Sequence, residues 1–294
     1  MHRIGVDIGG TQLRIALLDE DYGIVEVYKT SNDRSKRPEE NLSSLVGFVK
    51  DQQEAGIELA GIGIGCPGPL DLRAGKVLNP PNLVGWNDFP IVEFFARETG
   101  LPTYLNNDAN VAGLAEALLG GGKGAESVIF VGLSTGFGGA YVYRGELING
   151  AHGNTAEYWN MIVNDDPHGR GSANPGSLNE NAGGTGLARL ATLHYGEQTT
   201  PKELFERWYA GDQTAVDIME YATETLARGL ANIFWCYDPD VIVVGGSIDA
   251  YHPAYLEKAL QKAAAYVPSP DVLNIKKARF GDDAGLVGAA LLVP

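Results

Sequence analysis

Apolar residues alternate with other residues near the start of the chain. They stand at positions 4, 6 and 8, and the alternation resumes at positions 13, 15 and 17. This period of two predicts two strands joined by a tight turn at Gly9 and Gly10. Glycines leave backbone N–H groups unshielded, so such a turn can hold a phosphate, and Asp7 just before it could hold a hydrated Mg²⁺. An ordinary glycine hairpin with a solvated aspartate would show the same pattern.

The rest of the apolar pattern alternates between helical and strand-like segments. Apolar residues at helical spacing predict helices over residues 39–54, 91–98, 109–119, 186–195, 201–209, 214–235, 253–265 and 283–292. Short apolar runs predict strands over residues 61–65, 103–105, 127–133, 140–143, 241–244 and 272–278. Residues 149–186 are rich in Gly and Asn, and an irregular stretch of that length is usually functional or disordered. The mixture predicts an α/β protein.

A second glycine turn repeats the opening pattern. The apolar run ending at residue 133 is followed by Ser134-Thr135-Gly136-Phe137-Gly138-Gly139 and then by an alternating strand. Each hairpin is followed later by a buried strand that ends in glycines, the first near Gly68 and the second at Gly245 and Gly246. Two halves with this shared order, facing each other, would place the two turns on opposite sides of one cleft.

The sequence matches or nearly matches three known motifs, but the residues of or around each one do not fit the site that the motif forms. Gly63, Gly65 and Gly68 spell G-x-G-x-x-G, yet Pro67 and Pro69 forbid the helix that a dinucleotide site requires. The glycine run at 120–124 contains a lysine but lacks the Ser or Thr and the first glycine of a Walker motif. Residues 132–136 spell G-x-S-x-G, but a strand follows where a hydrolase nucleophile elbow needs a helix.

Charge and cysteine content narrow the function classes. With 22 Lys and Arg against 37 Asp and Glu, the net charge of −15 argues against a broad surface for nucleic acid or for an anionic membrane. Cys66 and Cys236 are too few for a disulfide framework, and no apolar run approaches membrane-spanning length. Because the N-terminus begins a strand rather than a signal peptide, we expect a cytoplasmic protein with no nucleic-acid or membrane partner.

Several motifs, in order and at matching separations, together resemble one family. They are Asp7-Ile8-Gly9-Gly10-Thr11, Pro67-Gly68-Pro69-Leu70-Asp71, Pro81-Asn82-Leu83-x-x-Trp86, Asn107-Asp108-Ala109-Asn110, Thr135-Gly136-x-Gly138-Gly139 and Asp238-Pro239-x-x-Ile242-x-x-Gly245-Gly246. Over essentially its whole length the chain resembles the sugar kinases of the ROK (repressor, open reading frame, kinase) family. Each motif alone is weak, whereas the ordered set is highly specific for the fold and strongly suggestive of kinase activity.

The resemblance implies a two-domain actin-like ATPase fold, of the ribonuclease H-like kind, with duplicated β-hairpin phosphate loops. The smaller N-terminal α/β domain would comprise residues 1–118 and 283–294, and the larger C-terminal one residues 119–282. The implied reaction transfers the γ-phosphate of ATP, with Mg²⁺, to the 6-hydroxyl of a hexose such as glucose or of a related hexose or N-acetylhexosamine. The resemblance leaves the sugar open. We also expect a homodimer, since family members are commonly dimers or tetramers.

The resemblance assigns roles to individual residues. Asp108 is implied as the general base, although an aspartate at a helix start also suits helix capping. Phosphates are implied to lie against Gly9, Gly10, Thr11, Thr135, Gly136 and Gly138, with Mg²⁺ near Asp7 and with Gly245 and Gly246 bordering adenosine. The sugar is implied to contact Gly68, Asn82, Asn107, Asp108, Glu157, Asn160 and Glu180.

The chain departs from the family where many members bind structural zinc. The zinc histidine corresponds to Asn160, and the three zinc cysteines correspond to Arg170, Ser172 and Ser177. Without thiolate or imidazole at these positions we expect no zinc. The glutamate that ends this family motif falls on Asn179 without gaps, or on Glu180 if one residue is inserted.

Two other function classes stay open at this point. One is a sugar-sensing regulator, because the family includes repressors, although those carry a DNA-binding module ahead of the sugar-binding part. The other is a catalytically inactive sugar-binding protein, which the altered zinc region suggests. Retention of Asp7, Asp108 and both glycine turns favours an active kinase.

Overall fold

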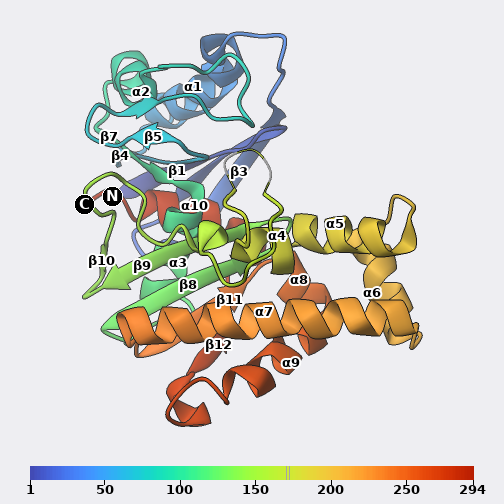
Figure 1. The fold of residues 1–294 in the computed structure, drawn as a ribbon. Coiled ribbons are helices and arrows are strands. Elements are labelled where there is room, and N and C mark those ends of the chain that lie inside the picture. Colours follow the sequence, from blue (N-terminus) through green and yellow to red (C-terminus); the bar gives the residue numbers. More distant parts are fainter. Residues whose placement is uncertain (170, 172) are drawn as a thin grey trace. The chain divides into compact units, whose positions relative to one another are not determined.

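The chain divides by its internal contacts into two compact units. The computed structural model describes every residue except 170 and 172 (Figure 1). Unit 1 comprises Met1–Gly120, Gly145–Thr155 and Phe280–Pro294, and unit 2 comprises Gly121–Arg144 and Ala156–Arg279. The domain boundaries at residues 118 and 283 stay a prediction. The two units differ from that prediction chiefly in that residues 145–155 belong to unit 1.

Unit 1 is built on a sheet with the strand order β3-β2-β1-β4-β7. Its strands are β1 (His2–Ile8), β2 (Gln12–Leu18), β3 (Ile24–Ser31), β4 (Leu59–Cys66) and β7 (Thr103–Asn107). The first three are antiparallel, whereas β4 and β7 run parallel to β1. Two short strands, β5 (Leu70–Asp71) and β6 (Lys76–Val77), form a separate hairpin, and β10 (Glu146–Leu147) belongs to the same unit.

Helices cover both faces of this sheet (Figure 1). On one face, α1 (Pro38–Glu54) and α2 (Ile91–Thr99) pack on Ile4, Leu13 and their neighbours. On the other, α3 (Asp108–Leu118) and α10 (Ala284–Ala290) pack on Ala16 and Leu18. An ideal Cβ at Gly63 of β4 would lie 1.7 Å from the Ala289 carbonyl oxygen, so this glycine is required for the close approach of α10.

Unit 2 has a sheet in which β9, β8, β11 and β12 are adjacent in that order. The bounds are Ser127–Leu133 for β8, Phe137–Tyr143 for β9, Val241–Gly245 for β11 and Ile275–Lys277 for β12. The helices are α4 (Leu178–Ala182), α5 (Gly184–Tyr195), α6 (Pro201–Tyr209), α7 (Gln213–Tyr237), α8 (Ser247–Tyr251) and α9 (Pro253–Ala263). Short 3₁₀ turns occur at Tyr158–Asn160, Pro270–Val272 and Gly281–Asp283, the last of them in unit 1.

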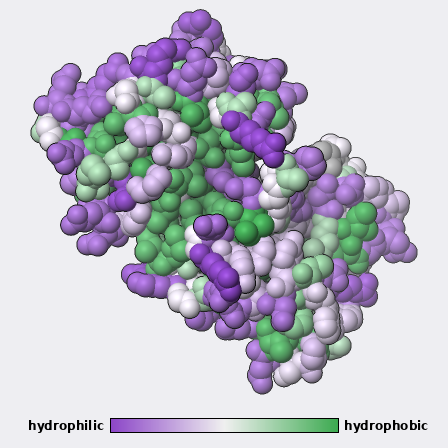
Figure 2. All heavy atoms as spheres, turned by 90° about the vertical axis from the view of Figure 1, so that its left-hand side faces the viewer, coloured by the Kyte–Doolittle hydropathy of each residue, from purple (hydrophilic) through white to green (hydrophobic). Residues whose placement is uncertain are grey.

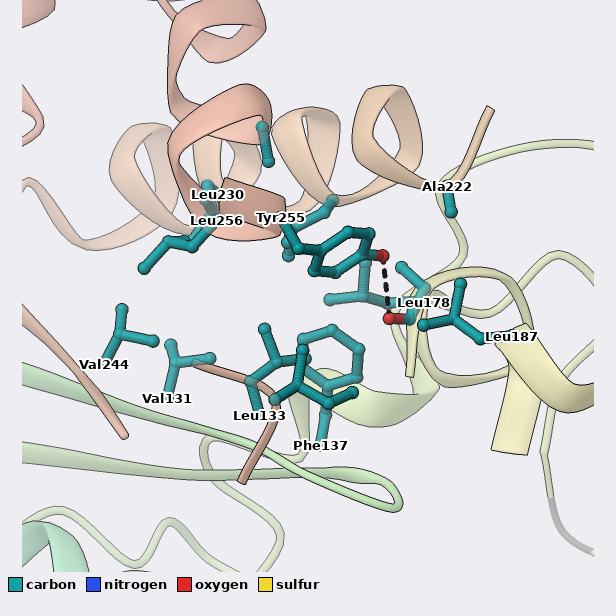
Figure 3. Packing of buried hydrophobic residues seen from close by; sticks show 14 of the residues in the cluster. Val131, Leu133, Phe137, Leu178, Leu187, Ala222, Leu230, Val244, Tyr255 and Leu256 are labelled. Atoms are coloured by element: carbon teal, nitrogen blue, oxygen red, sulfur yellow. Dashed lines mark hydrogen bonds between the residues drawn. The ribbon is translucent and has the colours of Figure 1, made fainter. Parts of the chain in front are cut away.

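The core of unit 2 lies between its sheet and these helices. Val131, Leu133 and Val244 of the sheet face Leu178, Leu187 and Leu256 of the helices (Figure 3). Tyr255 of α9 is fully buried, and its hydroxyl donates a hydrogen bond of 2.9 Å to the Ala182 carbonyl oxygen (Figure 3). The end of α4 is therefore anchored in the core.

Most helices and strands that the apolar pattern predicts are present, with ends shifted by a few residues. Within the stretch predicted to be irregular, α4 forms and α5 begins earlier than expected. After β4 the chain enters β5 rather than a helix. The helix that a dinucleotide site needs therefore does not follow β4, as the sequence predicts. The face drawn in Figure 2 carries both hydrophilic and apolar residues. Among the described residues, no helix is long and apolar enough to cross a membrane.

Candidate functional site

In unit 1 the residues predicted to lie near Mg²⁺ and to contact the sugar are found at one edge of the sheet. Asp7 pairs with Gly65 in the parallel β1–β4 register, and Gly65 pairs with Asn106 in the β4–β7 register. The carboxyl ends of these strands therefore bring Asp7 and Asn107 to the same edge, where ligands bind in open α/β sheets. Burial raises the pKa of the Cys66 thiol, and the negative charges of Asp108 and Asp7 raise it further. Both carboxylates thus lie near this buried thiol.

The start of α3 fixes the two polar residues that follow β7. Asn107 is the N-cap, and its Oδ1 accepts hydrogen bonds from the Ala109 and Asn110 N–H groups at 3.0 and 3.3 Å. Asp108 begins the helix, and its Oδ1 accepts from Ala109 N–H at 2.8 Å. The capping role that sequence reasoning allowed for Asp108 is therefore carried chiefly by Asn107. Because its oxygen is engaged, Asn107 can offer a ligand only its Nδ2 donor, which lies near Gly68.

The first glycine turn is held from two sides within unit 1. Gly9 N–H bonds to the Gln12 carbonyl oxygen at 2.9 Å and closes the turn. The Asn32 side chain donates to the Gly9 carbonyl oxygen, and the Asn32 N–H donates to the Thr11 carbonyl oxygen, both at 2.9 Å. An ideal Cβ at Gly10 would lie 3.0 Å from the Asn82 carbonyl oxygen. The structure therefore brings Gly9, Gly10 and Thr11 together with Asn82.

Asp7 is paired with Arg14 of the neighbouring strand. The Arg14 Nε and Nη2 atoms donate to Asp7 Oδ2 at 2.9 and 2.5 Å, and Nη2 also donates to the Asp282 carbonyl oxygen at 2.6 Å. Both Arg14 contacts fall on Oδ2, and Gly285 beside the carboxylate has no side chain to cover it. Oδ1 is thus a suitable oxygen ligand for a Mg²⁺ that keeps most of its waters.

In unit 2 the second glycine turn is held by the start of α5. Gly184 and Thr185 donate their N–H groups to the carbonyl oxygens of Ser134 and Thr135 at 3.0 and 2.8 Å. The Phe137 N–H donates to Asn179 Oδ1 at 3.2 Å. The turn that carries Thr135, Gly136 and Gly138 is therefore fixed from both of its sides.

The glycines that end β11 lie beside the same turn. Strands β8 and β11 are parallel, with Gly132 opposite Gly245. An ideal Cβ at Gly246 would lie 2.4 Å from the Leu133 carbonyl oxygen, and the Ser247 N–H donates to Ser134 Oγ at 2.9 Å. Gly246 also has φ of 102°, a backbone conformation that favours glycine. The residues predicted for phosphate and for adenosine in unit 2 thus gather at one place.

The predicted sugar residues of unit 2 lie on two adjacent segments. Glu157 is exposed and accepts a hydrogen bond from Trp159 Nε1. Asn160 Oδ1 accepts from the Asn174 N–H at 2.6 Å. Asn179 faces the glycine turn, whereas Glu180 is only 3% exposed and lies beside Arg189. The two candidates for the family glutamate therefore have different surroundings.

Comparison with known proteins places the chain in a family. The model of the ROK family matches residues 3–294. The chain belongs to the ROK family. It is 31% identical to a glucokinase of Halalkalibacterium halodurans, covering 99% of the chain and 94% of the relative. It is 30% identical to an N-acetyl-D-glucosamine kinase of Pasteurella multocida, covering 99% and 98%.

Solved structures agree with this ROK assignment. A ROK hexokinase from Thermus thermophilus matches with a TM-score of 0.92 and 32% identity, covering 100% of the chain and 98% of that structure. A ROK glucokinase from Streptomyces griseus in complex with glucose and AMPPNP matches with a TM-score of 0.76 and 28% identity, covering 100% and 99%. The resemblance and the actin-like ATPase fold that it implied are therefore confirmed. That both hairpin turns bind phosphate stays a prediction.

The positions of the family's zinc ligands are only partly described in this ROK chain. Asn160 and Ser177 lie in unit 2, whereas Arg170 and Ser172 lie outside the described residues. Ser177 is fully buried, at the residue before α4. Within the part of the chain that the structure describes, no group of three or more His, Cys, Asp and Glu could hold a metal ion.

Sequence reasoning missed the residues that hold these site residues in place. Arg14, Asn32 and Arg189 contact the predicted site residues directly through their side chains. Asn149 lies on a loop that borders a cavity of about 420 Å³ and accepts a hydrogen bond from Asn106 at 3.0 Å. No motif marks these residues, but a polar side chain on an otherwise apolar strand, as at Arg14, is a signal that could have found one of them.

Proposed function

We propose that this chain transfers the γ-phosphate of ATP to the 6-hydroxyl of a hexose or N-acetylhexosamine, with Asp108 as the general base. The ROK family and its named relatives make the chain an ATP-dependent hexose kinase. The observation that carries the finer proposal is the strand register of unit 1, because it gathers Asp7, Asn107 and Asp108 at one sheet edge. Named relatives act on glucose or on N-acetylated hexosamines, which supports that class of acceptor.

The residues of unit 1 can perform the acceptor half of this reaction. A carboxylate at Asp108 can accept the proton of the attacking hydroxyl, while Asn107 Nδ2 donates to a neighbouring hydroxyl and orients the sugar. Asp7 would hold Mg²⁺, which neutralises charge on the transferred phosphate. Arg14 keeps one oxygen of Asp7 engaged and so orients the other.

The residues of unit 2 suit the donor half. Backbone N–H groups in a glycine turn can contact phosphate without adding positive side chains, which fits a chain with a net charge of −15. Gly245 and Gly246 lie beside that turn, where we place the nucleoside.

Unit 2 also carries residues predicted to contact the sugar acceptor. Glu157, Asn160 and Glu180 supply acceptors and donors for sugar hydroxyls. Homodimer formation and a cytoplasmic location stay predictions.

An ADP-release assay across a sugar panel tests the proposal. The panel contains glucose, mannose, N-acetylglucosamine, N-acetylmannosamine and 6-deoxyglucose, which lacks the acceptor hydroxyl. We expect sugar-dependent ADP release with at least one hexose and none with 6-deoxyglucose, although 6-deoxyglucose should compete as an inhibitor. Sugar binding without ADP release would instead favour a regulator or an inactive sugar-binding protein.

The metal requirement gives a separate prediction. We expect activity to be lost with EDTA and restored by Mg²⁺, because ATP is used as its magnesium complex. We also expect no stoichiometric zinc in the purified protein. Asn160 stands where many family members have the zinc-binding histidine, and Ser177 stands where they have one of the zinc-binding cysteines. Elemental analysis checks this directly, and about one zinc per chain would contradict the ligand assignment.

A further inference from the structure

Helix α4 carries Glu180 between two apolar anchors. Leu178 and Ala182 are buried in the core of unit 2, and the Tyr255 hydroxyl bonds to the Ala182 carbonyl oxygen (Figure 3). These contacts fix the helix from its apolar side. With only five residues, α4 is too short to be stable on its own, so the direction of its polar residues depends on other contacts.

Arg189 of α5 supplies those contacts on the polar side. Its Nη2 and Nε atoms donate to the Glu180 carbonyl oxygen at 2.9 and 3.3 Å. Its Nε lies 4.0 Å from Glu180 Oε2. The same guanidinium donates to Asp166 Oδ2 at 2.6 Å, and both side chains of this ion pair are largely buried. One side chain therefore joins the turn of chain at Asp166 to the helix that carries Glu180.

The Arg189 contacts are part of a closed ring of hydrogen bonds. Arg189 Nη2 donates to Asn181 Oδ1 at 3.4 Å, and the Tyr221 hydroxyl of α7 donates to the same oxygen at 2.8 Å. Asn164 Nδ2 donates to the Tyr221 hydroxyl at 2.9 Å, and Asn164 Oδ1 accepts from the Asp166 N–H at 3.1 Å. The ring links segments of α4, α5 and α7 with the loop before α4.

The segment that carries Asn160 is held next to this ring by backbone hydrogen bonds. The Leu178 N–H donates to the Met161 carbonyl oxygen at 2.8 Å, and the Val163 N–H donates to the Gly176 carbonyl oxygen at 2.9 Å. The two arms of the loop are thus paired with each other next to the ring. Because Asn164 lies in one arm and Asn181 follows the other, the ring holds both arms at once.

Asp166 is suited to hold Arg189. Burial of its carboxyl raises the pKa, but hydrogen bonds from His168 and the Arg189 guanidinium outweigh that effect and lower the pKa below its usual value. The carboxylate therefore stays charged at neutral pH. Ion pairs of exposed side chains contribute little, whereas a shielded pair with additional hydrogen bonds fixes geometry.

We propose that Arg189 is a positioning residue for the sugar site: with Asp166 it holds Glu180 and the paired arms of the preceding loop in the orientation that binds the sugar. This inference rests on the proposed function, since it takes Glu180 as a sugar ligand. Arg189 itself contacts no reacting group in this assignment. Its planar guanidinium can bond to the Asp166 carboxylate, the Glu180 carbonyl and Asn181 together, which a lysine ammonium cannot do in the same geometry.

Three variants and a matched control test the proposal. Arg189→Met keeps an unbranched side chain as far as the Nε position but removes the charge and the donors, Arg189→Lys keeps the charge, and Asp166→Asn keeps the shape of the partner. Arg228→Met is the control, because Arg228 makes an exposed ion pair with Glu224 one helical turn away on α7. For each variant, calorimetry without nucleotide gives Kd for the panel sugar that binds the wild type most tightly. Steady-state assays give KM for that sugar and for ATP, and scanning calorimetry gives Tm.

We expect Arg189→Met to raise the sugar Kd and KM by about tenfold or more, with the KM for ATP changed by less than about twofold. Arg189→Lys should recover part of the affinity, and Asp166→Asn should give a smaller loss that is not additive with Arg189→Met. Arg228→Met should behave as the wild type. An unchanged sugar Kd in folded Asp166→Asn and Arg189→Lys would overturn the proposal. An increase in KM for ATP as large as the increase in KM for sugar would overturn it as well.

The binding measurement separates this inference from the proposed function. If the wild type binds sugar but releases no ADP, the kinase proposal fails while the Kd comparison still tests Arg189. If the wild type is an active kinase and the Arg189 variants keep its sugar Kd, only the positioning role fails. Should Arg189→Met not fold, the isosteric Asp166→Asn variant still decides the outcome.

Discussion

Replacement of Asp108 by Asn is expected to lower kcat by about 10²–10⁴-fold, with little change in the Kd for sugar or in Tm. An asparagine amide can still donate to and accept from the sugar, but it cannot take the proton of the attacking hydroxyl. The helix start should survive, because its N-cap is Asn107, which accepts from the Ala109 and Asn110 N–H groups. Single-turnover measurement of sugar phosphate formation checks the loss of rate. Titration calorimetry checks the Kd for sugar, and scanning calorimetry checks Tm.

Asp212→Asn is the matched control for the Asp108 variant. Asp212 is the N-cap of α7 in unit 2 and accepts the Ala215 N–H at 2.9 Å, so the same change is made at another helix start. Asn caps helices about as well as Asp, and we expect wild-type turnover and stability. An Asp108→Asn enzyme within about threefold of wild-type kcat, with contaminating kinase excluded, would refute the general-base assignment.

The sequence predicted the strands that carry or precede several of the candidate site residues. Ile4, Val6 and Ile8 set the period of β1, which places Asp7 next to the glycine turn, and the parallel register then brings Asp7 and Asn107 to one edge. The motif order indicated the family, and the family indicated the fold. The strand and its turn follow from local spacing, and the family follows from the order of motifs along the chain, whereas the register between β1, β4 and β7 comes from the structure.

Other parts could not be predicted because they depend on contacts between residues far apart in the chain. Helix α4 contains Asn179, Glu180 and Asn181 in succession, so it has no apolar period, and packing of Leu178 and Ala182 in the core makes it a helix. β2 is buried on both faces because α10, from the other end of the chain, covers Ala16 and Leu18. The partners of Asp7 and Glu180, Arg14 and Arg189, belong to no motif.

Glu116 is a further buried acid that the sequence shows only as one charge in an apolar helix. Its side chain is fully buried near the end of α3, and its Oε1 accepts the Phe280 N–H at 2.8 Å. An ideal Cβ at Gly120 would lie 2.0 Å from Glu116 Oε2, so the carboxylate fills the space beside this glycine. The chain first leaves unit 1 after Gly120, and the last segment of unit 1 begins at Phe280. Glu116 therefore contacts two of the points at which the chain passes from one unit to the other.

Replacement of Glu116 by Ala is expected to lower the Tm of the protein by about 6–12 °C. The partly buried Phe280 N–H would lose the Glu116 carboxylate as an acceptor, and a cavity would remain beside Gly120, for a combined destabilisation of about 3 kcal/mol. Glu116→Gln should lower Tm by less than half as much as Glu116→Ala. Its amide oxygen can still accept a hydrogen bond from the Phe280 N–H, and its side chain fills the same space. Glu54→Ala at the exposed end of α1 is the control and should leave Tm within about 2 °C of the wild type. Scanning calorimetry of the three variants separates loss of the hydrogen bond from loss of volume, and equal Tm values for Glu116→Ala and Glu54→Ala would show that this carboxylate stabilises neither segment.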